Sequence, residues 1–336
     1  MNSPRRRMRG VLREFRLHAL WLLASLALFE LALQVLDIRY LGLDTNNMAS
    51  LQYRYDAELG WSPRPNSQST MHLPRPTSVS HNSLGIRDVE FRKNERPTIL
   101  FIGDSMTWGY NVQAPERFSD RLRGRIQSHN VVNAGVSGFG TDQQYLFLKR
   151  LWNDIEPSLV VLVFCVENDH ADNSRNLRYS NFKPYLAEAA NGEWQFRGQP
   201  VPRPRISYFE DNWFAQRVML VRLAISVYVE LAHLRVRGPD PTERLLTMMH
   251  ELVEQKGAKL LVGVERHDPP VENVLKTRGI PYVMLDGAEL DGHTHHWSAR
   301  GNALVAERLA TLLSANGIQV SASDAGETPA SNAARP

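Results

Sequence analysis

The stretch PTILFIGDSMTWG, residues 97–109, decides the fold of this chain of 336 residues. Its first half is a short run of β-branched and other apolar residues that predicts a buried strand, and Gly103 ends the run in a turn. A helical pattern follows at 117–126. Ser105 therefore falls at a strand-to-helix junction, where its hydroxyl would project over the carboxyl edge of a sheet and nearby backbone N–H groups would face a developing oxyanion.

The alternation of strand and helix patterns continues along the chain. Further strand-like runs are found at 129–133, 159–166, 259–264 and 281–285. Helical runs are found at 143–152, 241–256 and 271–278. Strands that alternate with helices predict a parallel sheet covered on both faces and joined by right-handed crossovers. The fold class is therefore α/β, and the active site is expected at the carboxyl ends of the strands.

Three further motifs follow Ser105 in order: NAGVSGFGTDQ at 133–143, VEND at 166–169 and HHWSARGN at 295–302. Together with GDSMTWG, they resemble the four signature blocks of the GDSL/SGNH hydrolases. The resemblance covers about residues 97–313, with a long insertion outside it. The stretch from Tyr53 through NSLGIRD also resembles the lead-in of membrane-anchored bacterial members. The resemblance of the four motifs implies a flavodoxin-like three-layer α/β/α fold with a five-stranded parallel sheet. It also implies that the protein is a serine esterase or acyl-ester transferase.

The resemblance also implies the roles of four residues. Ser105 would be the nucleophile and His296 its general base, while Gly138 and Asn168 would donate hydrogen bonds to the oxyanion, with the backbone N–H of Ser105 as a third donor. This chemistry is coherent in itself, because a serine hydroxyl needs a base within reach and a tetrahedral intermediate needs fixed donors. Asp104, Asn133 and Gly135 are assigned to holding the loops in shape. Trp108 and Trp297 are expected to pack in the core, with a place in the pocket wall as the alternative.

One departure concerns the third member of a triad. The family usually places an aspartate two or three residues before the histidine, where this chain has His293 and Thr294. The nearest acid is Asp291, which would have to reach the histidine Nδ1 through a bulged loop. The alternative is a Ser105–His296 dyad oriented by a backbone carbonyl. A metal site at histidines 293, 295 and 296 is disfavoured because no ligand-spaced carboxylate or cysteine accompanies them, so we expect no metal and no cofactor.

The N-terminal region predicts a membrane anchor. Residues 17–36, LHALWLLASLALFELALQVL, are long enough to cross a bilayer as one helix, and six arginines precede them. By the positive-inside tendency, residues 1–16 stay cytoplasmic and the rest is exported to the periplasm or cell exterior. A cleaved signal peptide is the rival interpretation, but the segment is long and lacks a small-residue cleavage site. Glu30 and His18 are expected to be polar residues tolerated near its ends, and the alternative for Glu30 is contact with a protein partner in the membrane.

Charge and cysteine content argue against a nucleic-acid-binding protein and against a fold held by disulfides. The formal net charge is +3 and most of the excess lies in those six arginines, so a basic face for nucleic acid is not expected. The single cysteine, Cys165, allows no intramolecular disulfide.

Three segments outside the motifs complete the organisation. Residues 37–96 predict an extended lead-in to a hydrolase domain at 97–315, and 316–336 predict a disordered tail. The insertion at about 170–240 predicts a loop-like first half and an apolar helix at 209–234. We expect that helix to pack on the domain edge, with a lid or a second membrane contact as alternatives.

The substrate expected from resembling anchored proteins is a small acyl ester on a carbohydrate such as a polysaccharide. Hydrolysis and transfer are not distinguished by these residues. The alternatives are a lipase or lysophospholipase, favoured if the 209–234 helix lies on the membrane, and a non-catalytic polysaccharide-binding or scaffold subunit.

Overall fold

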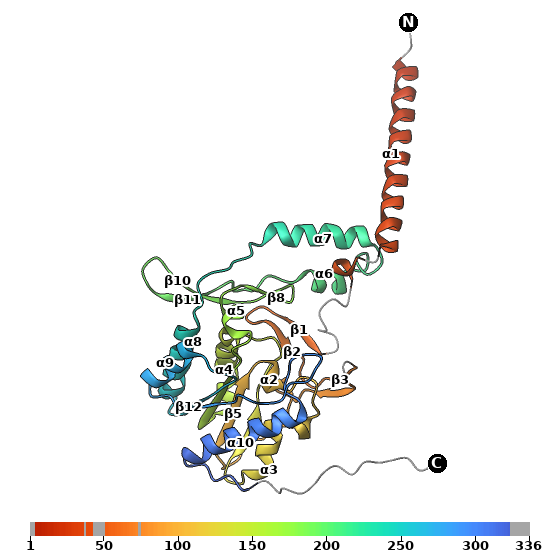
Figure 1. Cartoon of the computed structure of the whole chain (residues 1–336). Coiled ribbons are helices and arrows are strands. Elements are labelled where there is room, and N and C mark those ends of the chain that lie inside the picture. Colours follow the sequence, from red (N-terminus) through yellow and green to blue (C-terminus); the bar gives the residue numbers. More distant parts are fainter. Residues whose placement is uncertain (1–3, 37, 43–50, 73–74, 323–336) are drawn as a thin grey trace, which may run out of the picture. The chain divides into compact units, whose positions relative to one another are not determined.

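The computed structural model describes residues 4–36, 38–42, 51–72 and 75–322 (Figure 1). The chain divides into two compact units. Unit 1 contains Met1–Asn47 and Arg203–Leu234, and unit 2 contains Met48–Pro202 and Arg235–Pro336. The segment 203–234 therefore leaves the hydrolase domain and folds with the N-terminal helix.

Unit 2 is built on a five-stranded sheet in the order β13-β12-β7-β5-β6, and every neighbouring pair is parallel. The strands are β5 (Thr98–Gly103), β6 (Asn130–Asn133), β7 (Leu159–Phe164), β12 (Lys259–Val264) and β13 (Tyr282–Met284). Each lies within or next to its predicted run. The predicted α/β class with a five-stranded parallel sheet is confirmed.

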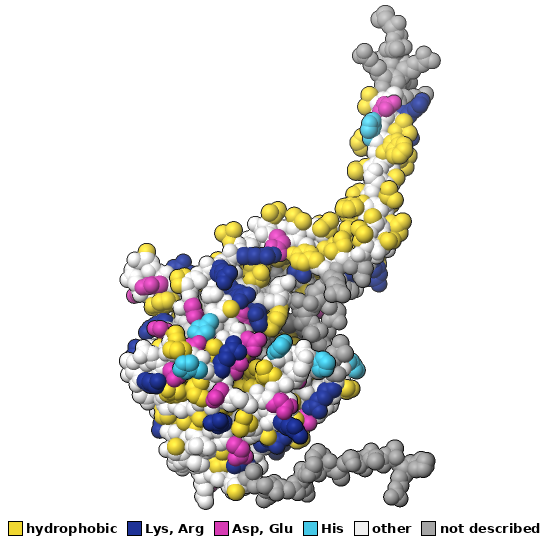
Figure 2. Space-filling model, in the orientation of Figure 1, with side chains coloured by type: hydrophobic (Ala, Val, Ile, Leu, Met, Phe, Trp, Pro, Cys, Tyr) yellow, Lys and Arg dark blue, Asp and Glu magenta, His cyan; other side chains and the backbone are white. Residues whose placement is uncertain are grey.

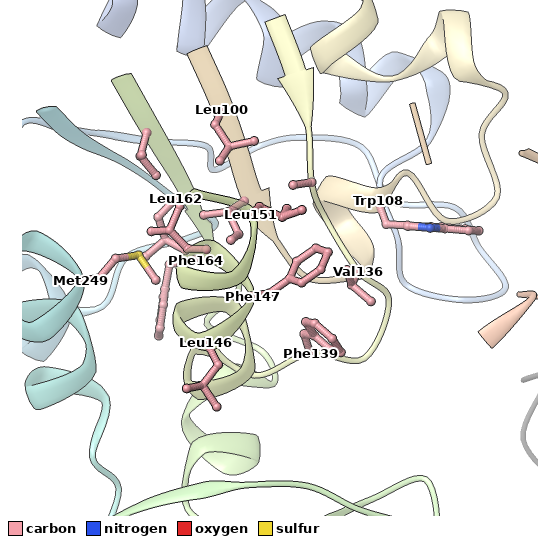
Figure 3. Packing of buried hydrophobic residues seen from close by; sticks show 14 of the residues in the cluster. Leu100, Trp108, Val136, Phe139, Leu146, Phe147, Leu151, Leu162, Phe164 and Met249 are labelled. Atoms are coloured by element: carbon pink, nitrogen blue, oxygen red, sulfur yellow. The ribbon is translucent and has the colours of Figure 1, made fainter. Parts of the chain in front are cut away.

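Helices cover both faces of this sheet. On one face lie α4 (Thr141–Ile155), α8 (Thr242–Gln255) and α9 (Pro269–Thr277). On the other lie α3 (Phe118–Arg125) and α10 (Ala299–Ala315). Successive side chains of β5 point to opposite faces of the sheet. Leu100, labelled in Figure 3, and Ile102 pack in the cluster on the side of α4, while Ile99 and Phe101 pack on the side of α3 and α10. Burying each such side chain contributes about 1.5–3 kcal/mol, so the central strand is fixed from both sides.

The lead-in forms hairpins rather than one extended segment. β1 (Tyr53–Asp56) pairs with β2 (Gly60–Pro63), and β3 (Gln68–Met71) pairs with β4 (Thr77–Ser80), both antiparallel. Tyr53 and Trp61 are buried in the same core cluster as α4. Residues 43–50 and 73–74 of the predicted lead-in lie outside the described part.

The first half of the insertion contains regular structure that the sequence did not predict. α5 (Asp169–Asn173) is followed by the short hairpins β8 (Leu177–Arg178) with β9 (Asn181–Phe182), and β10 (Tyr185–Glu188) with β11 (Trp194–Arg197). A buried ion pair joins Lys183 to Asp142 at the start of α4. These strands are too short to show a periodic pattern.

The second half of the insertion is two helices, α6 (Arg205–Asp211) and α7 (Met219–Ala232), instead of the one expected at 209–234. Asn212 separates them because its side-chain oxygen accepts the N–H groups of Phe214 and Ala215, which turns the backbone. Both helices belong to unit 1, in which α7 packs on α6 and on α1, so the expectation that one helix belongs to the edge of the hydrolase domain is corrected.

The N-terminal helix α1 (Pro4–Val35) starts well before the predicted span, so the described basic residues are part of the same helix; η1 (Arg39–Leu41) follows it. Within α1, Gly10–Val35 is 26 residues long and contains an 18-residue window with a mean hydropathy of 1.6, enough to cross a membrane by length and composition. At the other end, Ser321 donates its N–H to the carbonyl of Arg125 at 3.0 Å. The rest of the predicted disordered tail, 323–336, lies outside the described residues.

Candidate active site

Ser105 lies where the sequence predicts, between the central strand β5 and the short helix α2 (Ser105–Trp108). Asp104 caps this helix by accepting the N–H of Met106 at 2.8 Å, and Gly109 ends it with φ +82°. η2 (Ala114–Glu116) follows. Within the described part of the chain, the N–H of Ser105 donates no hydrogen bond, so it remains available at the start of α2. The cap holds the hydroxyl at the carboxyl edge of the sheet.

His296 lies in the loop between β13 and α10, and its Nε2 is 2.8 Å from the Oγ of Ser105. Two neighbours hold the loop. The buried Trp297 anchors it in the core, and Gly301 lets it approach α10, since a Cβ there would lie 2.1 Å from the carbonyl oxygen of Glu289. The ring of Tyr110 stacks on the imidazole with centroids 4.5 Å apart. The two residues predicted to exchange a proton are therefore in direct contact.

The other imidazole nitrogen is connected to Asp291 through a threonine. Nδ1 of His296 is 3.1 Å from Oγ1 of Thr294, and that hydroxyl donates to Oδ2 of Asp291. Asn111 donates from Nδ2 to the Asp291 carboxylate at 3.2 Å and also to the Thr294 hydroxyl. With hydrogen on Nδ1, the hydroxyl accepts from His296 and Asn111 and donates to Asp291, which satisfies all of its groups. Nε2 then presents its lone pair to Ser105.

This arrangement lies between the two alternatives that the sequence leaves open. Asp291 does not touch the imidazole directly, and the partner of Nδ1 is a side-chain hydroxyl rather than a backbone carbonyl. The N–H groups of His293 and Thr294 donate to Oδ1 of Asp291 at 2.9 and 2.7 Å, and His295 has φ +59°, which forms the expected bulge.

Burial and local charge set the protonation of these groups. Burial lowers the pKa of His296 below its usual value, and the carboxylates of Asp104 and Asp291 offset part of that effect. Burial raises the pKa of Asp291, but hydrogen bonds from Thr294, His293 and Asn111 outweigh it and leave the pKa well below its usual range. Near neutral pH the imidazole is therefore neutral and able to accept a proton, while Asp291 is ionised.

Gly138 lies in the loop that follows β6, and this loop lies against α2: a Cβ on Gly135 would be 2.4 Å from the N of Trp108. Gly138 has φ +84°, and among the described residues its N–H donates no hydrogen bond. Asn133 shapes the loop by donating to the carbonyl of Thr107 and accepting the N–H of Gly135. Glycine adopts this left-handed conformation without strain, and a backbone N–H without a partner in such a turn is suited to bind an anion.

Asn168 follows β7 at the same edge of the sheet. Its Nδ2 donates to Oδ2 of Asp104 at 3.0 Å, and that oxygen is 3.5 Å from the Oγ of Ser105. The bond to Asp104 orients the amide so that its second N–H remains for a ligand. Asp104 therefore has a wider role than loop shape, because it caps α2 and also positions Asn168.

Sequence reasoning missed four residues around the site: Tyr110, Asn111, Thr294 and Tyr179. Thr294 occupies the position of the family's usual acid, which was the only signal for it. Tyr179, in the turn between β8 and β9, has φ +49°, and its ring lies 2.9 Å from where a Cβ of Gly138 would be. The guanidinium of Arg178 covers this ring at 4.3 Å from its centroid.

Trp108 and Trp297 are both almost fully buried and pack in the core, so neither walls a pocket. Across residues 4–36, 38–42, 51–72 and 75–322, no group of three or more histidine, cysteine or acidic side chains is arranged to hold a metal ion. His293 and His295 are exposed beside the site, whereas His296 is engaged with Ser105.

Comparison with known proteins gives matches at the level of solved structures. The chain resembles G-D-S-L lipolytic proteins. One example comes from Desulfitobacterium hafniense, with 13% sequence identity over 65% of this chain and 100% of that one and a TM-score of 0.38. Another comes from Veillonella parvula, with 15% identity over 65% of this chain and 98% of that one and a TM-score of 0.39. An acetylxylan esterase from Geobacillus stearothermophilus also matches, with 13% identity over 66% of this chain and 96% of that one and a TM-score of 0.34. No protein-family model matches the chain, and no curated protein matches it.

Proposed function

We propose that this chain is a serine-dependent ester hydrolase or acyl-ester transferase that acts outside the cytoplasmic membrane. The observation that carries the proposal is the contact between Ser105 Oγ and His296 Nε2 at 2.8 Å, with the imidazole held on its other side by Thr294 and Asp291. A serine hydroxyl near neutral pH is activated by such a base. The intact contact supports an enzyme over a non-catalytic binding subunit.

The reaction has two halves. In the first, His296 takes the hydroxyl proton while Ser105 Oγ bonds to the ester carbonyl carbon, and the carbonyl oxygen becomes an oxyanion facing the N–H groups of Ser105, Gly138 and Asn168. His296 then returns the proton to the departing alkoxide, which leaves as an alcohol. In the second half, water or an acceptor hydroxyl gives its proton to His296 and attacks the acyl-enzyme carbonyl carbon. The bond to Ser105 Oγ then breaks, His296 returns the proton to Oγ, and the acyl group leaves as acid or new ester.

The substrate we propose is a small acyl ester on a carbohydrate. Tyr179 supports this proposal because the residue is 55% exposed and its ring lies beside Gly138, one of the proposed oxyanion donors. Sugar rings have apolar C–H faces that pack on such aromatic surfaces, while the phenol and Arg178 offer polar contacts to hydroxyl groups.

A second candidate is a lipase or lysophospholipase. Its specific support is α7, whose apolar side chains Val227, Tyr228 and Leu231 are exposed in unit 1. Aryl esters of increasing acyl length separate the two: a preference for acetyl supports the carbohydrate ester, and a preference for long acyl chains supports the lipid substrate.

The location we propose follows from α1, which would remain as an uncleaved single-pass anchor with the basic N-terminus in the cytoplasm and unit 2 outside. The length and hydropathy of Gly10–Val35 support a span. Protease digestion of sealed inside-out and right-side-out vesicles tests the orientation: unit 2 should be cleaved only when the outer face is accessible.

The decisive experiment for catalysis uses the full chain in detergent micelles with a p-nitrophenyl acetate substrate. Ser105→Ala and His296→Ala should each lower kcat/KM by about 10³-fold or more. The matched controls are Ser314→Ala on the exposed side of α10 and His293→Ala, and both should retain activity. A fluorophosphonate probe should label the wild type and not Ser105→Ala. A folded wild type that neither labels nor hydrolyses the ester refutes the proposal.

A further inference from the structure

The feature that the active site does not explain is the apolar surface of unit 1. The helix α7 packs on α6 through a small cluster that includes Val221 and Ile225 together with Ile206, Phe209 and Ala215. Its opposite side is uncovered: Val227, Tyr228 and Leu231 are 49%, 59% and 81% exposed. With Ala224 these residues are spaced three to four apart, so they form one stripe along the helix.

The stripe continues at both ends of α7. Leu234, just beyond its C-terminal end, is 85% exposed, and Trp213 and Phe214, in the turn before it, are 59% and 61% exposed. Figure 2 shows the hydrophobic side chains of α1 and those along α7 as adjoining surfaces. A single exposed Leu is ordinary, but a contiguous apolar surface of this kind marks an interaction site.

A specific contact joins α7 to α1. The carboxylate of Glu30 in α1 accepts the backbone N–H groups of Met219 and Leu220, both at 2.8 Å, and Gln34 donates to the same carboxylate at 2.7 Å. Glu30 thus caps the first turn of α7. A polar residue that the sequence predicts as merely tolerated in the span has a defined structural partner.

This contact sets the depth of α7 if α1 spans a bilayer. Glu30 is five residues before Val35, the end of the apolar stretch. At a rise of 1.5 Å per residue, the start of α7 lies roughly 8 Å inside the end of the span. Amphipathic helices that lie in a membrane surface bury their apolar side about 5–10 Å into the boundary between headgroups and acyl chains. The two depths agree.

We propose that α7 is an interfacial helix whose stripe of Ala224, Val227, Tyr228 and Leu231 lies in the outer leaflet of the bilayer that α1 crosses. The proposal rests on the membrane anchor put forward above. Lipid is the occupant because the stripe adjoins the apolar surface of α1. Flanking residues suit a membrane boundary: the guanidinium of Arg217 lies 4.4 Å from the ring centroid of Trp213, which places an aromatic ring and a cation together.

The experiment places a polarity-sensitive fluorophore at single sites of the full chain in phosphatidylcholine–phosphatidylglycerol vesicles. The background is Cys165→Ala, which removes the only cysteine. The test sites are Val227→Cys and Leu231→Cys. Trp21→Cys, near the middle of the span, reports the anchor, and Lys256→Cys, exposed in unit 2, is the aqueous control.

At the two test sites, emission should shift to shorter wavelength and should be quenched by lipid spin-labelled near the headgroup more than by lipid labelled deep in the acyl chain. Trp21→Cys should show the reverse depth preference, and Lys256→Cys should respond only to aqueous iodide. Test sites quenched by iodide like Lys256→Cys overturn the proposal. Test sites shielded from both quenchers also overturn it, because the stripe would then be covered by protein, such as a second copy.

These outcomes separate the further proposal from the proposed function. If Trp21→Cys reports a span and the test sites remain aqueous, α7 is not interfacial but the anchor stands. If Trp21→Cys is also aqueous, the anchor itself fails. Ester hydrolysis, measured on the same samples, reports the serine mechanism independently of either result.

Discussion

The hydroxyl between His296 and Asp291 leads to a specific prediction for Thr294→Val. Valine keeps the branched shape but removes the oxygen that lies 3.1 Å from Nδ1 and that donates to Asp291. The Nδ1–H of His296 then loses its acceptor in a half-buried site. During the reaction the imidazole becomes positively charged, so the lost hydrogen bond is one to a charged group.

Such a bond contributes about 1.5–3 kcal/mol, and each 1.36 kcal/mol is tenfold in rate. The expected loss in kcat/KM for Thr294→Val is therefore roughly 10- to 150-fold, smaller than the loss of about 10⁴ typical of replacing an aspartate in direct contact with the histidine. Thr294→Ser, which keeps the hydroxyl, should recover most of the activity.

The assay is steady-state hydrolysis of p-nitrophenyl acetate by the full chain, with Thr311→Val as the matched control. The hydroxyl of Thr311 only donates to a carbonyl within the exposed side of α10, so its loss should leave kcat/KM unchanged. If Thr294→Val keeps wild-type activity while Asp291→Asn loses it, the acid acts without the threonine and the relay is refuted. If both keep full activity, Ser105 and His296 work as a dyad.

Three other outcomes follow from the structure. Because burial lowers the pKa of His296, kcat/KM should fall on acidification only below the usual histidine range. Asp291→Asn removes a negative charge that raises this pKa, so the variant should lose activity only at still lower pH. A pH–rate profile measures both effects. Gly138→Ala should lower kcat by roughly 10²- to 10³-fold, with near-normal folding by circular dichroism, because it disturbs an oxyanion donor at φ +84°. Lys183→Met leaves the fully buried carboxylate of Asp142 unpaired and should cost about 3–5 kcal/mol of unfolding free energy by urea titration, and adding Asp142→Leu should recover part of it; no loss in the single variant would contradict the buried pair.

The site residues that could be predicted from the sequence are those identified by patterns in the residues next to them. Ser105 follows the apolar run Ile99–Ile102 after only Gly103 and Asp104, and Asn168 follows the apolar run of the neighbouring strand, so both could be assigned to the carboxyl edge. The position of His296 could be predicted because its spacing to Gly301 matches the final motif of the family that the chain resembles, and the structure shows that Gly301 lets the loop approach α10. These features depend on a few neighbours in the chain.

The rest depends on contacts between distant segments. The partner of Nδ1 could not be predicted because it requires the left-handed backbone at His295, and nothing in the sequence distinguishes that bulge from a loop that brings Asp291 into direct contact. Tyr179 reaches Gly138 from a hairpin of two-residue strands, which are too short to give a periodic signal. The division of the insertion between two units likewise depends on long-range packing of α7.

The hydrogen bonds of Glu30 also have a consequence for how the chain is made. Met219 is synthesised 189 residues after the carboxylate that accepts its N–H. At the usual 5–20 residues per second, this interval is roughly 10–40 s. Throughout it, α1 carries a carboxylate whose backbone partners do not yet exist. A chain interrupted before α7 therefore differs chemically from the finished protein at one position, because its N-terminal helix exposes Glu30 without the two N–H groups of α7.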